Sequence, residues 1–401
     1  MAGEDVTSSS LESPPLIPLA PEQLTTDFLR KTADRVINAT WDAGLPQWSW
    51  GEGVYLLSEV RYFETIQEQI PSRLLNWYAG RGALTSGHIN NVAPGAAASR
   101  LHALKVLDSS EINSVLEKWV MDPNSATRAA NGAVEHWPGG VWADTCYMMG
   151  TFLLNHGVGT KNAQYVEFIG EQLVAHIELL QNPNTKLFAH GSHKGESLWN
   201  YWGRGNAWMS LSCVEYLDAC EALEINPAAL NLIKTALRDQ LTALIPLQPE
   251  YGIWDVLVDH QVENKGILET SATAGFGAAM IRAGRHLPDM KAELDHVGKR
   301  AIAAALTYVN DEGVLTRTSA GTVLQLIPFG YSVIRSDRMQ LWGQGLALNA
   351  IAAMLEPDRN FVARCYSRFN TYFGSRYGLP GRRRNYHGRA VARRLCIWRN
   401  Y

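Results

Sequence analysis

The stretch Trp202-Gly203-Arg204-Gly205-Asn206-Ala207-Trp208 decides the fold. It opens with an aromatic residue, sets a polar side chain between glycines, and runs into an apolar helix rich in small residues. Five other stretches follow a similar plan. They are Trp50-Gly51-Glu52-Gly53-Val54-Tyr55, Asn91-Val92-Ala93-Pro94-Gly95-Ala96, Trp142-Ala143-Asp144-Thr145-Cys146-Tyr147, Glu269-Thr270-Ser271-Ala272-Thr273-Ala274 and Trp342-Gly343-Gln344-Gly345-Leu346-Ala347. Each one predicts the start of a helix.

The spacing of these six starts indicates a repeated unit. The steps between successive starts are 40, 52, 60, 67 and 73 residues, measured at Glu52, Val92, Asp144, Arg204, Ser271 and Gln344. Each step accommodates one outgoing and one returning helix, and such units must stack to bury their apolar faces. We therefore expect an all-α fold, an (α/α)6 barrel of six helical hairpins in a double ring. An open α-solenoid is the alternative, but it would not explain why nearly every repeat carries its polar residue at the same end.

Apolar residues at helical spacing support this mostly helical prediction. A helix capped at Thr26-Asp27 begins the folded part. The other predicted helical stretches are 101–120, 162–180, 209–223, 230–245 and 294–308. Strand-like runs are short, and the best two are 256–258 and 322–324.

The composition divides the 401 residues into unlike parts. Hydrophobic residues make up 46%, which suffices for a large core. The formal net charge of −3 gives no reason to expect a nucleic-acid or membrane partner. Residues 359–401 hold eleven Arg and no acidic residue, so the preceding part has a formal charge of −14. We expect a disordered leader at 1–25, a catalytic barrel at 26–358, and an Arg-rich extension at 359–401.

The cysteines and the N-terminal residues indicate a cytoplasmic protein. The five cysteines are widely spaced and form no CxxC or CxxH pair, which favours buried free thiols over disulfides or zinc. The first 25 residues are rich in Ser and Pro and lack the pattern of a signal peptide. No run of 18 apolar residues predicts a membrane span. A monomer is the default expectation.

Asp144 and the tryptophans are the first candidates for a site. Thirteen Trp residues, several at the helix starts, suit the packing of aromatic faces on sugar rings, although they would equally seal the mouth of a barrel. Asp144 follows Trp142 directly in a helix start. It serves either the helix dipole or, with its pKa raised by desolvation between Trp142 and Tyr147, general acid and base catalysis.

Arg204 is a poor structural choice at a helix start, because its charge opposes the helix dipole. Its planar fork suits a bidentate hold on a substrate carboxylate. His190, His193 and Glu196 form a weak metal-binding pattern, and a hydrogen-bonding histidine is the preferred interpretation of His190. No phosphate loop or complete dinucleotide motif occurs, so we expect neither a cofactor nor a metal.

In this order, the motifs resemble those of the unsaturated rhamnogalacturonyl hydrolases of glycoside hydrolase family 105 and, more loosely, the unsaturated glucuronyl hydrolases of family 88. The resemblance spans about residues 30–356. It rests on Val141–Met148, Phe188–Gly191, Trp202–Trp208, Gly252–Trp254 with Asp259, Leu268–Ala272 and Trp342–Gly345. The family fold is an (α/α)6 barrel, which agrees with the repeat count.

The resemblance implies a hydrolase acting on the 4,5-unsaturated uronic acid that polysaccharide lyases leave at a non-reducing end, most readily on rhamnogalacturonan fragments. One Asp gives a proton to C4 and then takes one from the water that attacks C5. Asp144 matches this residue. The positions that match the sugar site are His190, Arg204, Trp142, Met148, Trp202 and Trp208.

One position departs from the family pattern. Relatives often carry an Asp where this chain has Asn90, which would lower the pKa of Asp144 relative to theirs and alter the sugar preference. Three alternatives stay open: a glucuronyl hydrolase for other lyase products, a sugar epimerase or isomerase on the same barrel, and a carbohydrate-binding barrel without activity.

Overall fold

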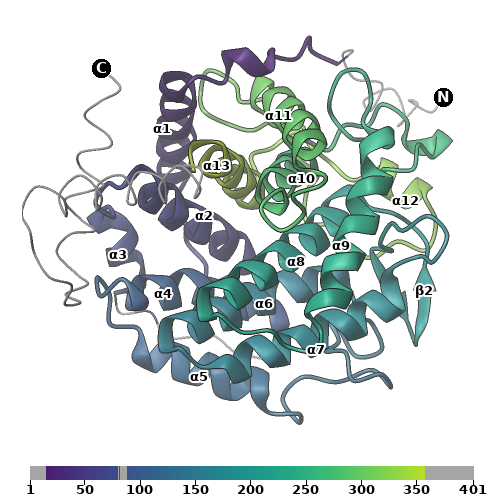
Figure 1. Cartoon of the computed structure of the whole chain (residues 1–401). Coiled ribbons are helices and arrows are strands. Elements are labelled where there is room, and N and C mark those ends of the chain that lie inside the picture. The colour runs from purple at the N-terminus through teal and green to yellow at the C-terminus, as the bar shows by residue number, and fades with distance from the viewer. Residues whose placement is uncertain (1–14, 80, 82–87, 357–401) are drawn as a thin grey trace, which may run out of the picture. The chain divides into compact units, whose positions relative to one another are not determined.

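The computed structural model describes residues 15–79, 81 and 88–356, and its helices form two sets (Figure 1). The inner set is α2 (Trp50–Ile66), α4 (Pro94–Ala103), α6 (Ala143–Thr160), α8 (Gly203–Leu223), α10 (Thr270–Ala283) and α13 (Leu341–Leu355). The outer set is α1 (Thr26–Ala43), α3 (Ser72–Tyr78), α5 (Ser110–Met121), α7 (Ala163–Leu180), α9 (Leu230–Leu244) and α11 (Lys291–Thr307).

Short elements occupy the connections between these helices. They are the 3-10 turns η1 (Pro21–Gln23), η2 (Ile89–Val92), η3 (Ile245–Leu247) and η4 (Val262–Asn264), the helix α12 (Phe329–Ser332), and the strands β1 (Gly191–His193) and β2 (Glu196–Leu198). The two strands form an antiparallel hairpin. None of the described helices is long and apolar enough to cross a membrane.

Small residues let the inner helices pack closely. A Cβ added to Gly345 of α13 would lie 2.9 Å from the Cα of Tyr55 in α2, and one added to Gly53 would lie 2.6 Å from the carbonyl carbon of Ala93. Side chains larger than hydrogen would therefore push these backbones apart. The inner helices are buried around most of their circumference, whereas α1 and α9 bury a single apolar stripe.

The ring of inner helices is closed. Neighbours from α2 to α10 contact one another in chain order. The last inner helix, α13, joins α10 to α2, since a Cβ on Gly275 of α10 would lie 3.5 Å from Leu346, and Trp342 stacks on Trp50 of α2 with ring centroids 4.1 Å apart. The predicted (α/α)6 barrel is confirmed, and the open solenoid is excluded.

All six quoted stretches lie at or just before the start of an inner helix, so the barrel places them at one rim. Two other sequence predictions were wrong. The best strand-like runs, 256–258 and 322–324, form only an isolated bridge or none among the described residues. The strands lie instead at 191–193 and 196–198. The 101–120 stretch is broken into α4 and α5 by the turn at 104–109.

Residues 15–25, the last part of the expected leader 1–25, contact the end of α11 and lead into α1. The backbone N–H groups of Leu16 and Leu19 donate to the side-chain hydroxyls of Tyr308 and Thr307 at the end of α11, at 2.8 and 2.9 Å. Thr25, rather than Thr26, caps α1 by accepting from the N–H of Phe28. Residues 1–14 and the Arg-rich extension at 359–401 lie outside the described residues.

Buried ion pairs join the inner helices near the ends opposite the rim. Arg61 of α2 donates to both carboxylate oxygens of Glu215 in α8, which lies across the ring. Arg282 of α10 donates to Glu215 at 2.6 Å and to Asp218 at 2.7 Å. Burial raises the pKa of Glu215, but the charges of Arg282 and Arg61 outweigh it and lower this pKa to about 2.

We predict that Glu215→Gln lowers the free energy of unfolding by about 3–5 kcal/mol, because it leaves the buried guanidinium of Arg61 without its counter-charge and removes one of the two carboxylates that face Arg282. In the parent protein the stabilisation holds above pH 4.5, the ordinary pKa of Glu, and declines as the pH falls toward 2. Urea unfolding measures both effects. The control Asp289→Asn breaks the exposed pair with Arg238 and should change stability far less. Equal losses in the two variants would contradict this role of Glu215.

Candidate active site

Asp144 is the second residue of α6 and lies at the rim, 8% exposed. A bridge between Trp142 and Gly191 brings the segment before β1 against the start of α6, and the N–H of Ala143 donates to the carbonyl of His190. This pairing places Nε2 of His190 3.5 Å from Oδ2 of Asp144. The structure therefore brings together two of the residues singled out by sequence.

Rings form the walls around Asp144 and His190. The His190 ring lies 4.2 Å from that of Trp202 and 5.2 Å from that of Trp142, between centroids. On its other side Trp142 stacks on His136, at 4.4 Å and an interplanar angle of 8°. Aromatic rings grouped in this way suit the apolar faces of a sugar ring.

Several buried polar atoms of this aromatic cluster and of the segments beside it have no hydrogen-bond partner among the described residues. They are Oδ2 of Asp144, Nε2 of His190, Nε1 of Trp202 and of Trp208, Oδ1 of Asn90 and Nε2 of His88. Buried polar groups in proteins are almost always satisfied, so a cluster of unsatisfied ones marks a place where a polar ligand binds. Both donors and acceptors are present, as the hydroxyls of a sugar require.

The pKa of Asp144 is lowered rather than raised, which corrects the sequence expectation. Burial raises this pKa, as expected, but Nε2 of His190, 3.5 Å from Oδ2, and the charges of its neighbours, including Arg204, outweigh burial. Burial also lowers the pKa of His190 and brings that of His136 to about 3, so both rings are neutral near pH 7. In the free protein Asp144 is an ionised carboxylate facing a neutral imidazole.

Arg204 is fully buried and its terminal nitrogens donate to the protein. Nη1 donates to the hydroxyl of Ser319 at 2.7 Å and to Glu269 at 3.3 Å, and Nη2 donates to the carbonyl of Ala320 at 2.9 Å. Its carbon Cζ lies 4.4 Å from the centre of the Trp202 ring. The geometry favours a positioning role, which fixes Trp202 and the segment before α13, over the direct hold on a substrate carboxylate that we expected.

The remaining sequence candidates are spread along the inner wall. Met148 is buried in α6, and Trp208 of α8 stacks on Tyr147 at 4.6 Å. Asn90 lies in η2, which packs against α6. These positions are consistent with a site that extends from the rim into the barrel.

Sequence reasoning missed His136 and Tyr331. Pro138-Gly139 form a tight turn with Gly139 at a φ of 83°, and the N–H of Gly140 donates to the carbonyl of Trp137 at 2.8 Å. This turn folds His136 back onto Trp142, and the Pro-Gly pair could have indicated it. Tyr331 accompanies His190 from a distant segment that no local pattern links to the site.

The weak metal pattern is not assembled. His190 is buried beside Asp144, whereas His193 and Glu196 are exposed on the β1–β2 hairpin. Elsewhere Asp218, Glu221 and His286 lie close enough to hold a metal ion. However, Asp218 is already paired with Arg282 and Arg285, whose charges oppose a cation.

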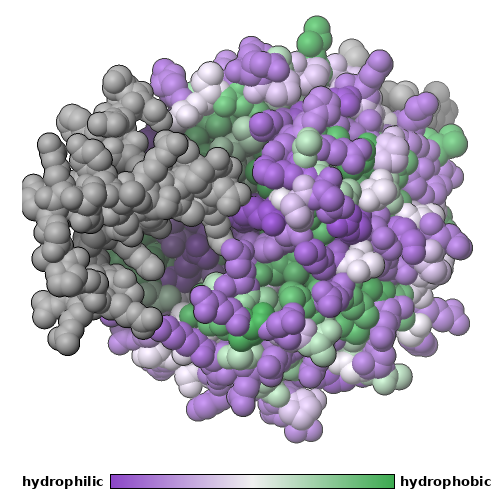
Figure 2. All heavy atoms as spheres, viewed as in Figure 1, coloured by the Kyte–Doolittle hydropathy of each residue, from purple (hydrophilic) through white to green (hydrophobic). Residues whose placement is uncertain are grey.

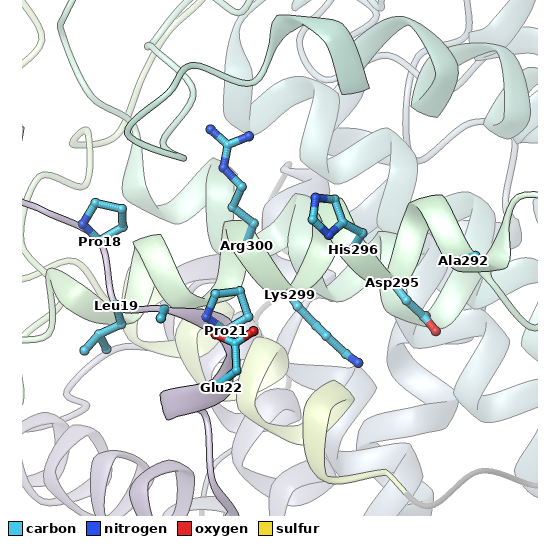
Figure 3. A pocket seen from close by; sticks show the side chains of 10 residues that line it. Pro18, Leu19, Pro21, Glu22, Ala292, Asp295, His296, Lys299 and Arg300 are labelled. Atoms are coloured by element: carbon cyan, nitrogen blue, oxygen red, sulfur yellow. The ribbon is translucent and has the colours of Figure 1, made fainter.

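A surface groove of about 630 Å³ lies between α11 and residues 18–22 (Figure 3). His296, Lys299 and Arg300 contribute to its lining, and it includes none of the candidate residues. On the face seen in Figure 2, hydrophilic residues cover most of the described surface and hydrophobic residues occur between them. The cluster of aromatic rings and unpartnered polar atoms around Asp144 at the rim, which we call the rim site, is therefore the candidate site.

Comparison with known proteins identifies the family. The family model described as Glycosyl Hydrolase Family 88 matches residues 23–357. The unsaturated rhamnogalacturonyl hydrolase YesR of Bacillus subtilis (strain 168) is 31% identical over 341 residues, which cover 81% of this chain and 94% of that protein. This chain therefore belongs to the family described as Glycosyl Hydrolase Family 88, in agreement with the resemblance of its motifs.

Solved structures share the fold. A possible member of the GH105 family from Salmonella enterica has a TM-score of 0.72 at 24% identity, covering 84% of this chain and 95% of that one. A possible GH105 member from Klebsiella pneumoniae has a TM-score of 0.70 at 23% identity, covering 90% and 99%. The unsaturated glucuronyl hydrolase of Bacillus sp. GL1 has a TM-score of 0.57 at 14% identity, covering 77% and 87%.

The positioning role of Arg204 gives a stability prediction. Arg204→Met should lower the free energy of unfolding by about 3–5 kcal/mol, because it leaves Glu269 buried without its counter-charge. Adding Glu269→Gln should recover most of that loss in a urea titration. An Arg204→Met protein of unchanged stability, with a raised KM for an unsaturated uronate, would instead support the direct hold on substrate.

Proposed function

We propose that this chain hydrolyses oligosaccharides that end in a 4,5-unsaturated uronic acid, with unsaturated rhamnogalacturonan fragments as the favoured substrate. The observation that carries the proposal is the buried carboxylate of Asp144, which faces His190 among aromatic rings and unsatisfied donors and acceptors. The names of YesR and of the glucuronyl hydrolase of similar fold support the substrate class.

The proposed reaction is the hydration of a vinyl ether. Asp144 in its acid form gives its proton to C4, and positive charge develops at C5 and the ring oxygen. Water then bonds to C5 while Asp144 takes one of its protons, which restores the acid. The hemiketal so formed opens to a ketone at C5, and the glycosidic link at C1 falls apart as a hemiacetal. One carboxyl group suffices, so no second carboxylate flanking the glycosidic bond is required.

The substrate itself helps to supply the acid form of Asp144. In the free protein this carboxyl is ionised at neutral pH, since its pKa is lowered. A bound uronate brings another negative charge into the buried site, which raises the pKa of Asp144. Activity in the complex should fall as the pH rises above this pKa.

Unsaturated glucuronyl hydrolysis is the second candidate, supported by the likeness of fold to glucuronyl hydrolases. The same carboxyl chemistry would serve both substrates. His190 and His193 are the pair that the sequence offers to an isomerase at the barrel mouth, and the structure does not bring these two together, because His190 is buried at Asp144 whereas His193 is exposed on its hairpin.

Asp144→Asn should abolish the loss of the alkene's ultraviolet absorbance when the protein is incubated with lyase-generated rhamnogalacturonan fragments, because an amide cannot donate the proton. The same assay with glycosaminoglycan fragments separates the two substrate candidates. A thermal melt checks that the variant is folded. Undiminished turnover by the folded variant would exclude Asp144 as the acid.

Asn90→Asp should move the alkaline limb of the kcat profile to higher pH. A second carboxylate on η2, beside α6, disfavours ionisation of Asp144 and so keeps its acid form to higher pH. The neighbouring variant Asn91→Asp is the matched control, since both residues are half-buried but only Asn90 has its Oδ1 among the buried unpartnered atoms of the described residues. An unchanged limb in Asn90→Asp would show that the side chain at 90 does not act on Asp144.

A further inference from the structure

Tyr331 enters the site from the long segment between α11 and α13. Its ring is fully buried, and it belongs to the short helix α12. The segment is fastened to the rim on both sides: Asn200 donates to the carbonyl of Gln325 at 2.9 Å, and Asn264 donates to that of Pro328 at 3.0 Å. The position of the Tyr331 hydroxyl is therefore fixed.

The Tyr331 hydroxyl has two recorded partners. The backbone N–H of Gln325 donates to it at 3.4 Å, and Nδ1 of His190 lies 2.8 Å away. Among the described residues no other acceptor is recorded for the hydroxyl proton. A buried O–H without an acceptor is costly, so the hydroxyl donates to Nδ1. Nδ1 is then an acceptor, and the ring proton of neutral His190 must be on Nε2.

Nε2 is the nitrogen that faces Oδ2 of Asp144 at 3.5 Å. The rings of Trp142 and Trp202 both contact His190 and limit its rotation. Other polar groups also interact electrostatically with Asp144. They are His136 in the segment before α6, His88 before η2, Arg204 of α8 and the Tyr331 hydroxyl itself.

We propose that Tyr331 is a positioning residue that holds His190 in its Nε2–H tautomer and so aims an N–H at Asp144. This inference deepens the proposed function and rests on it only for its consequence in catalysis. The Gln325 N–H donates to Tyr331, Tyr331 donates to His190, and the Nε2–H of His190 then faces Asp144. This arrangement stabilises the carboxylate of Asp144 over its acid form. The negative charge of the substrate must overcome that preference before Asp144 can act as an acid.

The first test needs no substrate. Two-bond proton–nitrogen spectra of histidine-labelled protein near pH 7 distinguish the two tautomers, with His190→Gln assigning the signal. We expect the Nε2–H pattern in the parent protein and a mixture of both tautomers in Tyr331→Phe. Tyr308→Phe, which removes a buried hydroxyl bonded to Leu16, should leave the His190 signals unchanged. An Nδ1–H pattern in the parent, or an unaltered tautomer in folded Tyr331→Phe, overturns the proposal.

The second test measures the consequence in catalysis. Without the Tyr331 hydroxyl the preference for ionised Asp144 weakens, so the alkaline limb of kcat should move up by about half to one pH unit. The shift should vanish in the His190→Gln background, because Tyr331 acts through His190. A uniform loss of kcat at every pH, without a shift, would indicate a merely structural residue and overturn this role.

The two failures are distinguishable. Retained activity in Asp144→Asn would defeat the proposed function and leave the tautomer result standing. A wrong tautomer together with an inactive Asp144→Asn would defeat only the role of Tyr331.

Discussion

The close approach of the inner helices is the constraint on which the rest of the structure depends. Gly53 and Gly345 leave room for backbones that any larger side chain would separate. The contact between α13 and α2, sealed by Trp50 on Trp342, closes the ring. Closure gathers the starts of the inner helices at one rim, which is why residues from distant repeats meet around Asp144.

Two opposing electrostatic effects act on Asp144 at the rim site. Burial favours the neutral acid form of Asp144, whereas His190 and the surrounding charges favour the carboxylate. The positive charge of Arg204 is balanced by the carboxylate of Glu269. Arg204 also donates to the carbonyl of Ala320 and so holds the segment before α13. The negative charge of a uronate is therefore the change that most readily returns the proton to Asp144.

The sequence was sufficient for the repeats, the rim and the place of Asp144 at the start of α6, because each depends on a local pattern at a helix start. It was insufficient where a long-range contact decides the outcome. The pKa of Asp144 depends on His190, which reaches it through a bridge between Trp142 and Gly191. The local sequence left the Arg204 guanidinium without protein partners and so available to a substrate, because its partners at 319–320 lie more than a hundred residues away in the chain. Tyr331 had no local signal at all.

The most direct test of the account is to locate isotopes after turnover in deuterated, oxygen-18 water. Hydration of the alkene predicts deuterium at C4, the heavy oxygen in the new carbonyl at C5, and the glycosidic oxygen retained on the released sugar. Rapid mass spectrometry, before the carbonyl exchanges with solvent, would read this pattern. Heavy oxygen at C1 with the alkene intact would contradict it and indicate ordinary attack at the anomeric carbon.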